Sequence, residues 1–248
     1  TIKPAISHEK IILDKGVYTE GSYFGDVNGD GKIDLIAGPL WWEGPDFQKK
    51  HRYRAGEAVS PKGYAHNSFQ SWVMDMNGDG RADIFQVAHD GKFHLDLYLQ
   101  PQKPSEDWPR HRVVAKVGNE SPEMGDLTGD GKPEFIAMQG GKFGFFTPDW
   151  KNAEEPWVFH PISPNRTGSP YYHGLGFGDL NGDGNVDLLE KEGWYEAPAD
   201  PLKSGDWKFQ PYTLSSKKGG AQMLVYDIDG DGDQDIVTSL SAHSFGLA

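Results

Sequence analysis

Short apolar segments recur along the chain, and each of them runs directly into a cluster of acidic residues. "SYFG" precedes the cluster at Asp26, and "MLVY" precedes the cluster at Asp227. A second apolar segment leaves each cluster, as in "IDLIAG" and "QDIVTS", and alternating segments such as "KFHLDLYLQ" and "HRVVAK" follow. Alternation with a period of two is typical of strands that bury one face. The pattern predicts about four short antiparallel strands for each cluster.

The acidic clusters repeat at a nearly constant spacing. They begin at Asp26, Asp75, Asp126, Asp179 and Asp227, so the intervals are 49, 51, 53 and 48 residues. A period near fifty with four strands in each repeat is typical of a β-propeller. We therefore predict an all-β fold: a single β-propeller domain over residues 1–248, with four-stranded blades that start near residues 21, 70, 121, 173 and 221.

The two ends of the sequence bear on the number of blades. Residues 8–14 have the pattern of a fourth strand without the three strands before it, so we expect them to close the last blade. The sequence ends in "SLSAHSFGLA", where a third strand is expected. Five copies are compatible with a five-bladed ring or with a fragment of a larger ring, and this ending favours the fragment.

Each acidic cluster has the composition of a calcium-binding loop. Oxygen donors stand on alternate residues, with glycines between them that let the chain bend around an ion. The glutamate that closes an EF-hand at position twelve is absent, since Ala37 stands there in the first copy, and strands rather than helices flank the loop. The alternative is a set of Asx-rich turns without metal. Five copies in phase favour calcium.

The expected calcium ligands are positions one, three, five, seven (through its carbonyl) and nine of each loop. They are Asp26, Asn28, Asp30, Lys32 and Asp34; Asp75, Asn77, Asp79, Arg81 and Asp83; Asp126, Thr128, Asp130, Lys132 and Glu134; Asp179, Asn181, Asp183, Asn185 and Asp187; and Asp227, Asp229, Asp231, Asp233 and Asp235. The third loop is the weakest candidate, because Thr128 is a poorer donor and Glu134 is longer than aspartate.

The charge balance agrees with calcium binding and excludes one class of partner. The formal net charge is -13, and the five loops contain 17 carboxylates. Such a surface repels nucleic acid, whereas five divalent ions would offset about ten negative charges. The chain has no cysteine and no apolar run long enough for a transmembrane helix. Because calcium is plentiful outside the cytoplasm, we expect an extracellular or periplasmic protein.

The D-x-N-G-D-G-x-x-D units resemble the FG-GAP and VCBS repeats of integrin-like propellers. The segments "NESPEMGDLTGDG", "HGLGFGDLNGDG", "EGWYEAP", "AQMLVYDIDGDG" and "SAHSFGLA" resemble the secreted VCBS-repeat proteins of planctomycetes. These in turn are similar to the propeller domain of aldos-2-ulose dehydratase. That resemblance implies a seven-bladed ring and a zinc ion, in the propeller cleft, that assists the elimination of water from a keto-sugar.

Residues at matching positions on the first strands are expected to meet around the propeller axis. Six residues before each loop stand Glu20, Phe69, Glu120, His173 and Ala221. Glu20, Glu120 and His173 are therefore the candidate catalytic residues. The null hypothesis is that the histidine is a hydrogen-bonded core residue and that the glutamates form ion pairs at the rim.

Further polar and aromatic residues are expected on the same face, upstream of the first strands or at the ends of the second strands. The candidate substrate-binding residues are Trp42, Asn67, Trp194, Tyr195 and Gln222, with Trp41 and His89 nearby. Candidate zinc ligands are His66, His173 and His243, because imidazole suits zinc or another divalent transition metal. Packing between blades is the alternative role for the tryptophans.

Two classes of function are compatible with this face. One is a metal-assisted sugar dehydratase or lyase, in which Glu120, Glu20 or a histidine removes a proton beside a carbonyl. The other is a non-catalytic module that binds a glycan or a protein through Trp42, Trp194 and Tyr195. A purely architectural domain of a larger protein is a third interpretation. Carbohydrate is the expected partner in the first two cases, and the metal content of the protein would distinguish them.

Overall fold

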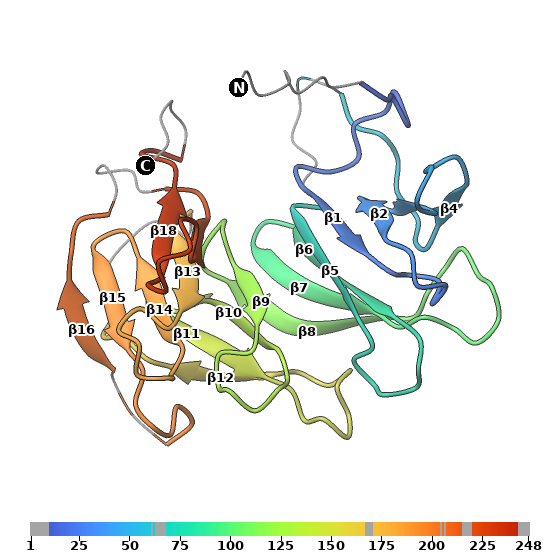
Figure 1. Cartoon of the computed structure of the whole chain (residues 1–248). Coiled ribbons are helices and arrows are strands. Elements are labelled where there is room, and N and C mark those ends of the chain that lie inside the picture. The colour runs from blue at the N-terminus through green and yellow to red at the C-terminus, as the bar shows by residue number, and fades with distance from the viewer. Residues whose placement is uncertain are drawn as a thin grey trace, which may run out of the picture. The chain divides into compact units, whose positions relative to one another are not determined.

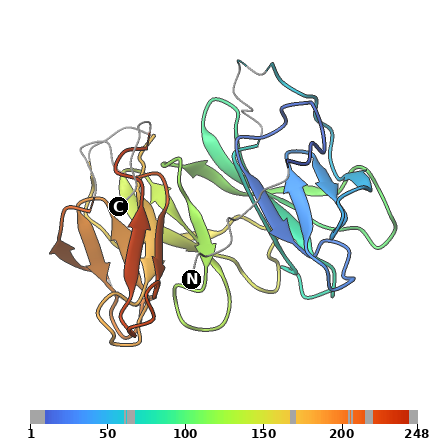
Figure 2. The same ribbon diagram turned by 45° about the horizontal axis from the view of Figure 1, so that its top comes forward.

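The computed structural model describes residues 10–60, 62, 68–166, 171–203, 205, 207–214 and 220–242. This part of the chain contains strands and no α-helix, as Figures 1 and 2 show from two directions. The strands are β1 (Ser22–Gly25), β2 (Asp34–Ala37), β3 (Leu40–Trp42), β4 (Lys50–Arg52), β5 (Gln70–Met74), β6 (Asp83–His89), β7 (Phe93–Tyr98), β8 (Arg110–Val117), β9 (Glu123–Gly125), β10 (Glu134–Gln139), β11 (Lys142–Thr147), β12 (Val158–Pro161), β13 (Leu175–Gly178), β14 (Asp187–Glu190), β15 (Gly193–Glu196), β16 (Lys208–Pro211), β17 (Met223–Tyr226) and β18 (Asp235–Thr238).

Consecutive strands form consecutive sheets. Four sheets have four strands each, in the orders β1-β2-β3-β4, β5-β6-β7-β8, β9-β10-β11-β12 and β13-β14-β15-β16, and β17 pairs with β18. The pairings are antiparallel; Gly25 lies opposite Asp34, and Gly178 lies opposite Asp187. The predicted all-β fold with four-stranded antiparallel repeats is therefore confirmed. Residues 10–14 lie in no strand and residues 8–9 lie outside the described part, so the closing strand stays a prediction, as do the ring and its blade number.

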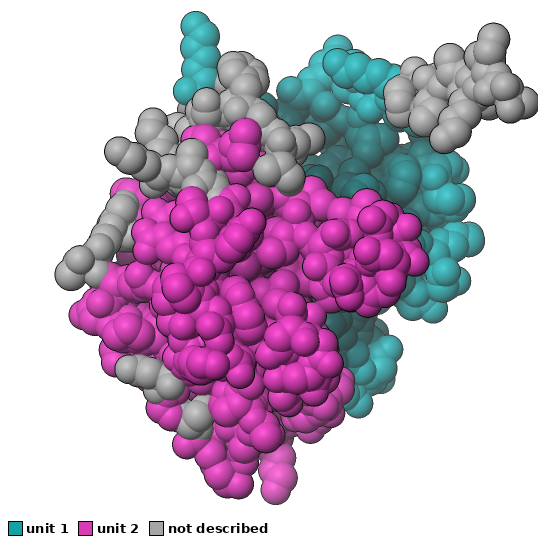
Figure 3. Space-filling view, turned by 60° about the vertical axis from the view of Figure 1, so that its left-hand side comes forward, with its two compact units in different colours: residues 1–89, 98–110 teal, residues 90–97, 111–248 magenta. Residues whose placement is uncertain are grey.

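The chain divides into two compact units, which Figure 3 colours separately. Unit 1 comprises residues 1–89 and 98–110, and unit 2 comprises residues 90–97 and 111–248. The core of unit 1 is aromatic: the ring of Tyr53 is fully buried and packs edge-on against Tyr98, with centroids 5.2 Å apart. Its hydroxyl donates a hydrogen bond of 2.8 Å to the carbonyl of Gly38, so burial leaves no unpaired phenol.

The core of unit 2 joins the third and fourth sheets. Phe143 and Phe145 of β11 are fully buried there, together with Leu175 of β13, Leu188 of β14 and Tyr195 of β15. Burial of one such side chain stabilises the fold by about 1.5–3 kcal/mol. The apolar positions found in the sequence thus form the contact between neighbouring sheets.

Glycines bring the first strands of neighbouring sheets close together. A Cβ atom at Gly125 would collide with the ring of Phe177, and one at Gly178 would collide with Val225. Both glycines stand directly before a loop aspartate, and both contacting residues stand two positions before the next one. Gly25 has the same relation to Val73 in unit 1. This repeated contact sets the first strands side by side within each unit.

Candidate functional site

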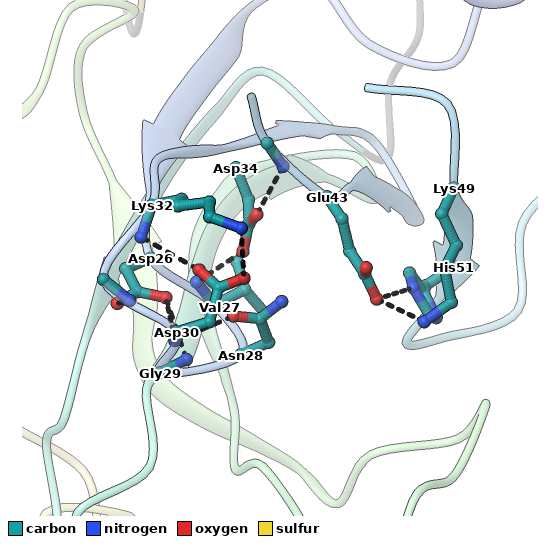
Figure 4. A network of polar contacts seen from close by, with 12 residues as sticks. Asp26, Val27, Asn28, Gly29, Asp30, Lys32, Asp34, Glu43, Lys49 and His51 are labelled. Carbon is teal, nitrogen blue, oxygen red and sulfur yellow. Dashed lines mark hydrogen bonds and ion pairs between the residues drawn. The ribbon is translucent and has the colours of Figure 1, made fainter. Parts of the chain in front are cut away.

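The first residue of each acidic loop organises the loop backbone. Asp26 accepts hydrogen bonds from the N–H groups of Gly29 (2.8 Å), Asp30 (3.1 Å) and Gly31 (2.8 Å), as Figure 4 shows in part. Gly29 and Gly31 have φ angles of 74° and 81°, in the left-handed region that glycine adopts without strain. The same bonds to the glycines at positions four and six recur at Asp75, Asp126, Asp179 and Asp227.

The ninth position is a buried carboxylate in each of the first four loops. Asp34 is fully buried; its Oδ2 accepts the N–H of Val27 and its Oδ1 accepts the N–H of Gly44, both at 2.8 Å. Asp83 and Asp187 each accept two backbone N–H groups in the same way. Burial raises the pKa of both to about 6, and nearby loop carboxylates add to the shift. The ninth residue therefore ties its loop to the hairpin that follows.

The fifth loop shows most directly that the carboxylates converge. Carboxylate oxygens of Asp227, Asp229 and Asp235 lie within 4.8 Å of one another, which is the spacing of ligands around one cation. In the first loop Asn28 occupies the third position, and its Oδ1 accepts the N–H of Asp30 at 3.0 Å, as Asp229 accepts that of Asp231 at 3.1 Å. The two loops thus share their backbone pattern, and the donor set of both fits calcium.

The second and third loops differ in detail. The guanidinium of Arg81 forms a close ion pair with Asp79, so one loop carboxylate already has a cationic partner. In the third loop the longer Glu134 accepts the N–H groups of Leu127 and Thr128 with one oxygen, at 2.9 and 3.0 Å. Burial, reinforced by Asp130 and Asp126, raises the pKa of Glu134 to about 7. Calcium binding by these loops stays a prediction, as it does for the others.

Two of the candidate catalytic residues meet in unit 2. Nε2 of His173 lies 2.7 Å from Oε2 of Glu120, and the two side chains are 13% and 24% exposed. The backbone explains the contact: the N–H of Glu120 donates to the carbonyl of Tyr172 at 3.0 Å, and Asn119 and Tyr172 form a parallel bridge. These two residues, at the same offset from their loops, therefore lie together in the segments that lead into β9 and β13.

A third carboxylate belongs to the same region and was missed in the sequence. Glu123, on β9, hydrogen-bonds to the side chain of Gln222. Leu175 and Gln222 form a parallel bridge, so three neighbouring first strands supply this group of side chains. Burial raises the pKa of Glu123 to about 7, and its Oε1 has no hydrogen-bond partner among the described residues. The available signal was an acidic residue three positions after Glu120.

A charged network lies beside His173. Arg166 donates to the fully buried Glu190 at 2.9 Å and to the hydroxyl of Tyr195 at 3.0 Å. Tyr172, the residue before His173, donates its hydroxyl hydrogen to the other oxygen of Glu190 at 3.0 Å. Burial raises the pKa of Tyr172 and of Glu190, and Arg166 opposes the second shift. This network fixes the strand segment that carries His173.

The structure corrects the expectation of exposed aromatic anchors at Trp42 and Tyr195. Trp42 is 4% exposed, and Tyr195 is fully buried in the core between the third and fourth sheets. Trp194 is half-buried, and Trp41 is buried against His51. Tyr171, two residues before His173, is 50% exposed and supplies an accessible ring in this region. Of the three predicted rings, Trp194 alone keeps partial exposure, and Tyr171 is an exposed ring that the sequence analysis did not single out.

The remaining candidate residues do not join the group around His173 within the described part of the chain. Glu20 is exposed, its N–H donates to the carbonyl of Ser68 at 3.0 Å, and it belongs to unit 1 together with Phe69 and His89. Asn67, His66 and His243 lie outside the described residues. Within residues 10–60, 68–166 and 171–242 as far as they are described, no metal-binding group of three forms around His173. The zinc prediction therefore depends on residues that the structure does not describe.

Comparison with known proteins gives a family for part of the chain. Residues 75–137 match the model of the FG-GAP-like repeat. No curated protein matches the chain. The repeated β-rich architecture seen above agrees with this match.

Two solved structures are similar to this chain. An Agrocybe aegerita lectin that recognises non-reducing terminal N-acetylglucosamine is similar at 15% identity and a TM-score of 0.53 over 92% of this chain. The V. cholerae biofilm matrix protein Bap1 is similar at 18% identity and a TM-score of 0.43 over 70% of this chain. The chain spans 65% of the length of the lectin and 29% of that of Bap1. The described part of the chain contains no helix of the length and apolarity needed to span a bilayer.

Proposed function

We propose that this chain is a calcium-stabilised β-propeller of the FG-GAP type that binds carbohydrate through the region of Glu120 and His173. The observation that carries the proposal is the 2.7 Å contact between these side chains, with Glu123 three residues after Glu120 and Gln222 directly before β17. A carboxylate, an imidazole and an amide offer donors and acceptors for vicinal hydroxyls. The fold-level likeness to a lectin agrees with this use.

The region has the construction expected of a binding site. Its backbone is fixed by parallel bridges, and the network of Arg166 and Glu190 holds the neighbouring segment. The unpartnered Oε1 of Glu123 is a buried acceptor whose pairing with a ligand hydroxyl would remove a cost of about 1–3 kcal/mol. Tyr171 offers an exposed ring to the apolar face of a sugar.

Calcium has a structural role in this proposal. Each loop joins a first strand to a second strand, and its carboxylates repel one another in the absence of a cation. An ion in each loop would lock the turn and with it the first strand that carries the site residues. Calcium at millimolar concentration is found outside the cytoplasm, so the proposal includes an extracellular or periplasmic location.

A glycan array probed with the calcium-loaded protein tests the binding function. Glycans that end in N-acetylglucosamine are the first probes, because the similar lectin recognises this sugar. Saturable binding that His173→Ala abolishes is the expected result. Absence of binding to all arrayed glycans, with the protein folded and loaded with calcium, would contradict the proposal.

A β-elimination is the second candidate function, and the carboxylate–imidazole pair is the observation that favours it. His173, oriented by Glu120, would remove the proton from the carbon beside a sugar carbonyl. The C–H electrons form a double bond as the C–O bond on the next carbon breaks. The protonated Glu123, whose pKa is about 7, gives its proton to the departing hydroxyl, so water leaves.

Enone absorbance distinguishes the two functions. With keto-sugars such as 1,5-anhydrofructose, glucosone or 3-keto-glucosides, an elimination would produce a new ultraviolet band that His173→Ala removes. Binding without that band, at zinc concentrations from zero to saturation, assigns the site to recognition alone.

A further inference from the structure

A concave surface lies in unit 1, and Glu120 and His173 are not among its lining residues. A cleft of about 500 Å³ is formed beside β4, the outermost strand of the first sheet. Leu40 and Pro104 contribute apolar surface, and Ser105 adds a hydroxyl. Its volume matches that of sites for small ligands.

The charged residues of this cleft are already paired. The guanidinium of Arg52 contacts the carboxylate of Glu106 at 2.7 Å, and the ammonium of Lys50 contacts Asp14 at 2.9 Å. Arg52 and Lys50 therefore bring no uncompensated positive charge, and an anion would have to displace a carboxylate. The Arg52–Glu106 pair is still accessible to a ligand, because the arginine side chain is 42% exposed and the glutamate side chain 72%.

One wall of the cleft is rigid. The ring of His51 is stacked on the buried Trp41, with centroids 4.1 Å apart and planes 13° from parallel. Its Nε2 lies 2.7 Å from the carboxylate of Glu43, which Lys49 also contacts from outside the cleft at 2.6 Å (Figure 4). The imidazole is thus held on one face and one edge, which fixes the middle of β4 between Lys50 and Arg52.

We propose that this cleft binds an uncharged pyranose. Adjacent donors and acceptors on Arg52 and Glu106 suit neighbouring hydroxyls, the apolar Leu40, which lies opposite Arg52 in the sheet, suits the C–H face of the sugar, and the paired charges disfavour an anion. This subsite is additional to the one at Glu120 and His173, and it does not depend on that proposal.

Two-dimensional NMR of the calcium-loaded protein tests this inference directly. The methyl glycosides of glucose, galactose, mannose and N-acetylglucosamine are added singly, with glucuronate and sulfate as anionic probes. At least one neutral glycoside should shift the signals of Arg52 and His51 with a saturable dissociation constant.

Three variants localise the effect. Arg52→Met, which keeps the apolar stem, and Glu106→Gln should each weaken this binding at least fivefold. Lys49→Met is the matched control, because it also removes a positive charge next to β4. Lys49 does not line the cleft, so the affinity for the glycoside should not change. His173→Ala should also leave it unchanged, which separates this subsite from the one in unit 2.

Three results would overturn the proposal. The first is that no neutral glycoside gives saturable shifts at Arg52 and His51. The second is that glucuronate or sulfate binds more tightly than any neutral sugar. The third is that both Arg52→Met and Glu106→Gln bind with full affinity. Thermal midpoints of the variants show that each is folded, and Glu106→Gln remains informative if Arg52→Met is not.

Discussion

The start of the first strand appears twice with the same backbone and with different side chains. In unit 1 the N–H of Glu20 donates to the carbonyl of Ser68 at 3.0 Å, and in unit 2 the N–H of Glu120 donates to the carbonyl of Tyr172 at 3.0 Å. The next residue along is Phe69 in the first case and His173 in the second. Only in unit 2 does this position give a carboxylate–imidazole contact. The repeat therefore supplies the frame, and single side chains within it supply the chemistry.

Removal of calcium should break the frame in both units and have the largest effect. Each loop bound at a hundredfold excess over its dissociation constant is expected to contribute about 3 kcal/mol to stability. Chelation should therefore lower the thermal midpoint strongly and cooperatively. Calorimetry with and without chelator measures this, with magnesium as the control ion. An unchanged midpoint after verified removal of calcium would contradict a structural role.

Loss of a single ninth-position carboxylate should be the next largest effect. Asp34→Ala leaves the buried N–H groups of Val27 and Gly44 without their acceptor, which costs about 2–4 kcal/mol. Urea unfolding in saturating calcium measures the change, and Glu57→Ala, at an exposed site, is the control. If Asp34→Ala and the control had the same free energy of unfolding within error, the hydrogen bonds from Asp34 to the hairpin would not contribute to stability.

The raised pKa of Glu123 predicts a pH effect on stability in unit 2, and the matching position in unit 1 is occupied by Tyr23. The folded carboxyl holds its proton up to about pH 7, whereas an unfolded glutamate loses it near its ordinary pKa. The folded state thus binds more protons in this window, and stability falls as the pH rises from about 4.5 through 7. Glu123→Gln should flatten that part of the profile. Urea unfolding of both proteins between pH 5 and 8 measures the difference, and an identical slope would show that the shift is absent.

The smallest effect is expected when the side chain of unit 2 is transferred to unit 1. Phe69→His places an imidazole next to Glu20 at the offset of His173. A neighbouring carboxylate should raise the pKa of that introduced imidazole by up to about one unit. NMR titration of the variant and of Phe69→His combined with Glu20→Gln isolates the effect. Equal values in the two proteins would mean that matching offsets do not bring side chains together in unit 1.

The sequence was most informative where the repeat dictates the backbone. The five acidic loops, the antiparallel hairpins and the contact of Glu120 with His173 follow from counting along equal repeats. Burial was harder to foresee. Trp42 and Tyr195 stand in alternating segments whose inward face cannot be assigned before the neighbouring sheet is known. The network of Arg166 and Glu190 joins a connecting segment to the end of β14. Arg166 belongs to no repeated pattern, so periodicity gave no signal for this network.

The central claim, that a common frame places a sugar-binding site at Glu120 and not at its equivalent Glu20, has a direct test. Titration calorimetry with the best glycan from the array compares Glu120→Gln with the matched variant Glu20→Gln. Loss of a hydrogen bond to a charged group should weaken binding about tenfold or more in Glu120→Gln, and Glu20→Gln should bind as the parent does. Equal affinities in all three proteins, or a loss confined to Glu20→Gln, would contradict the account.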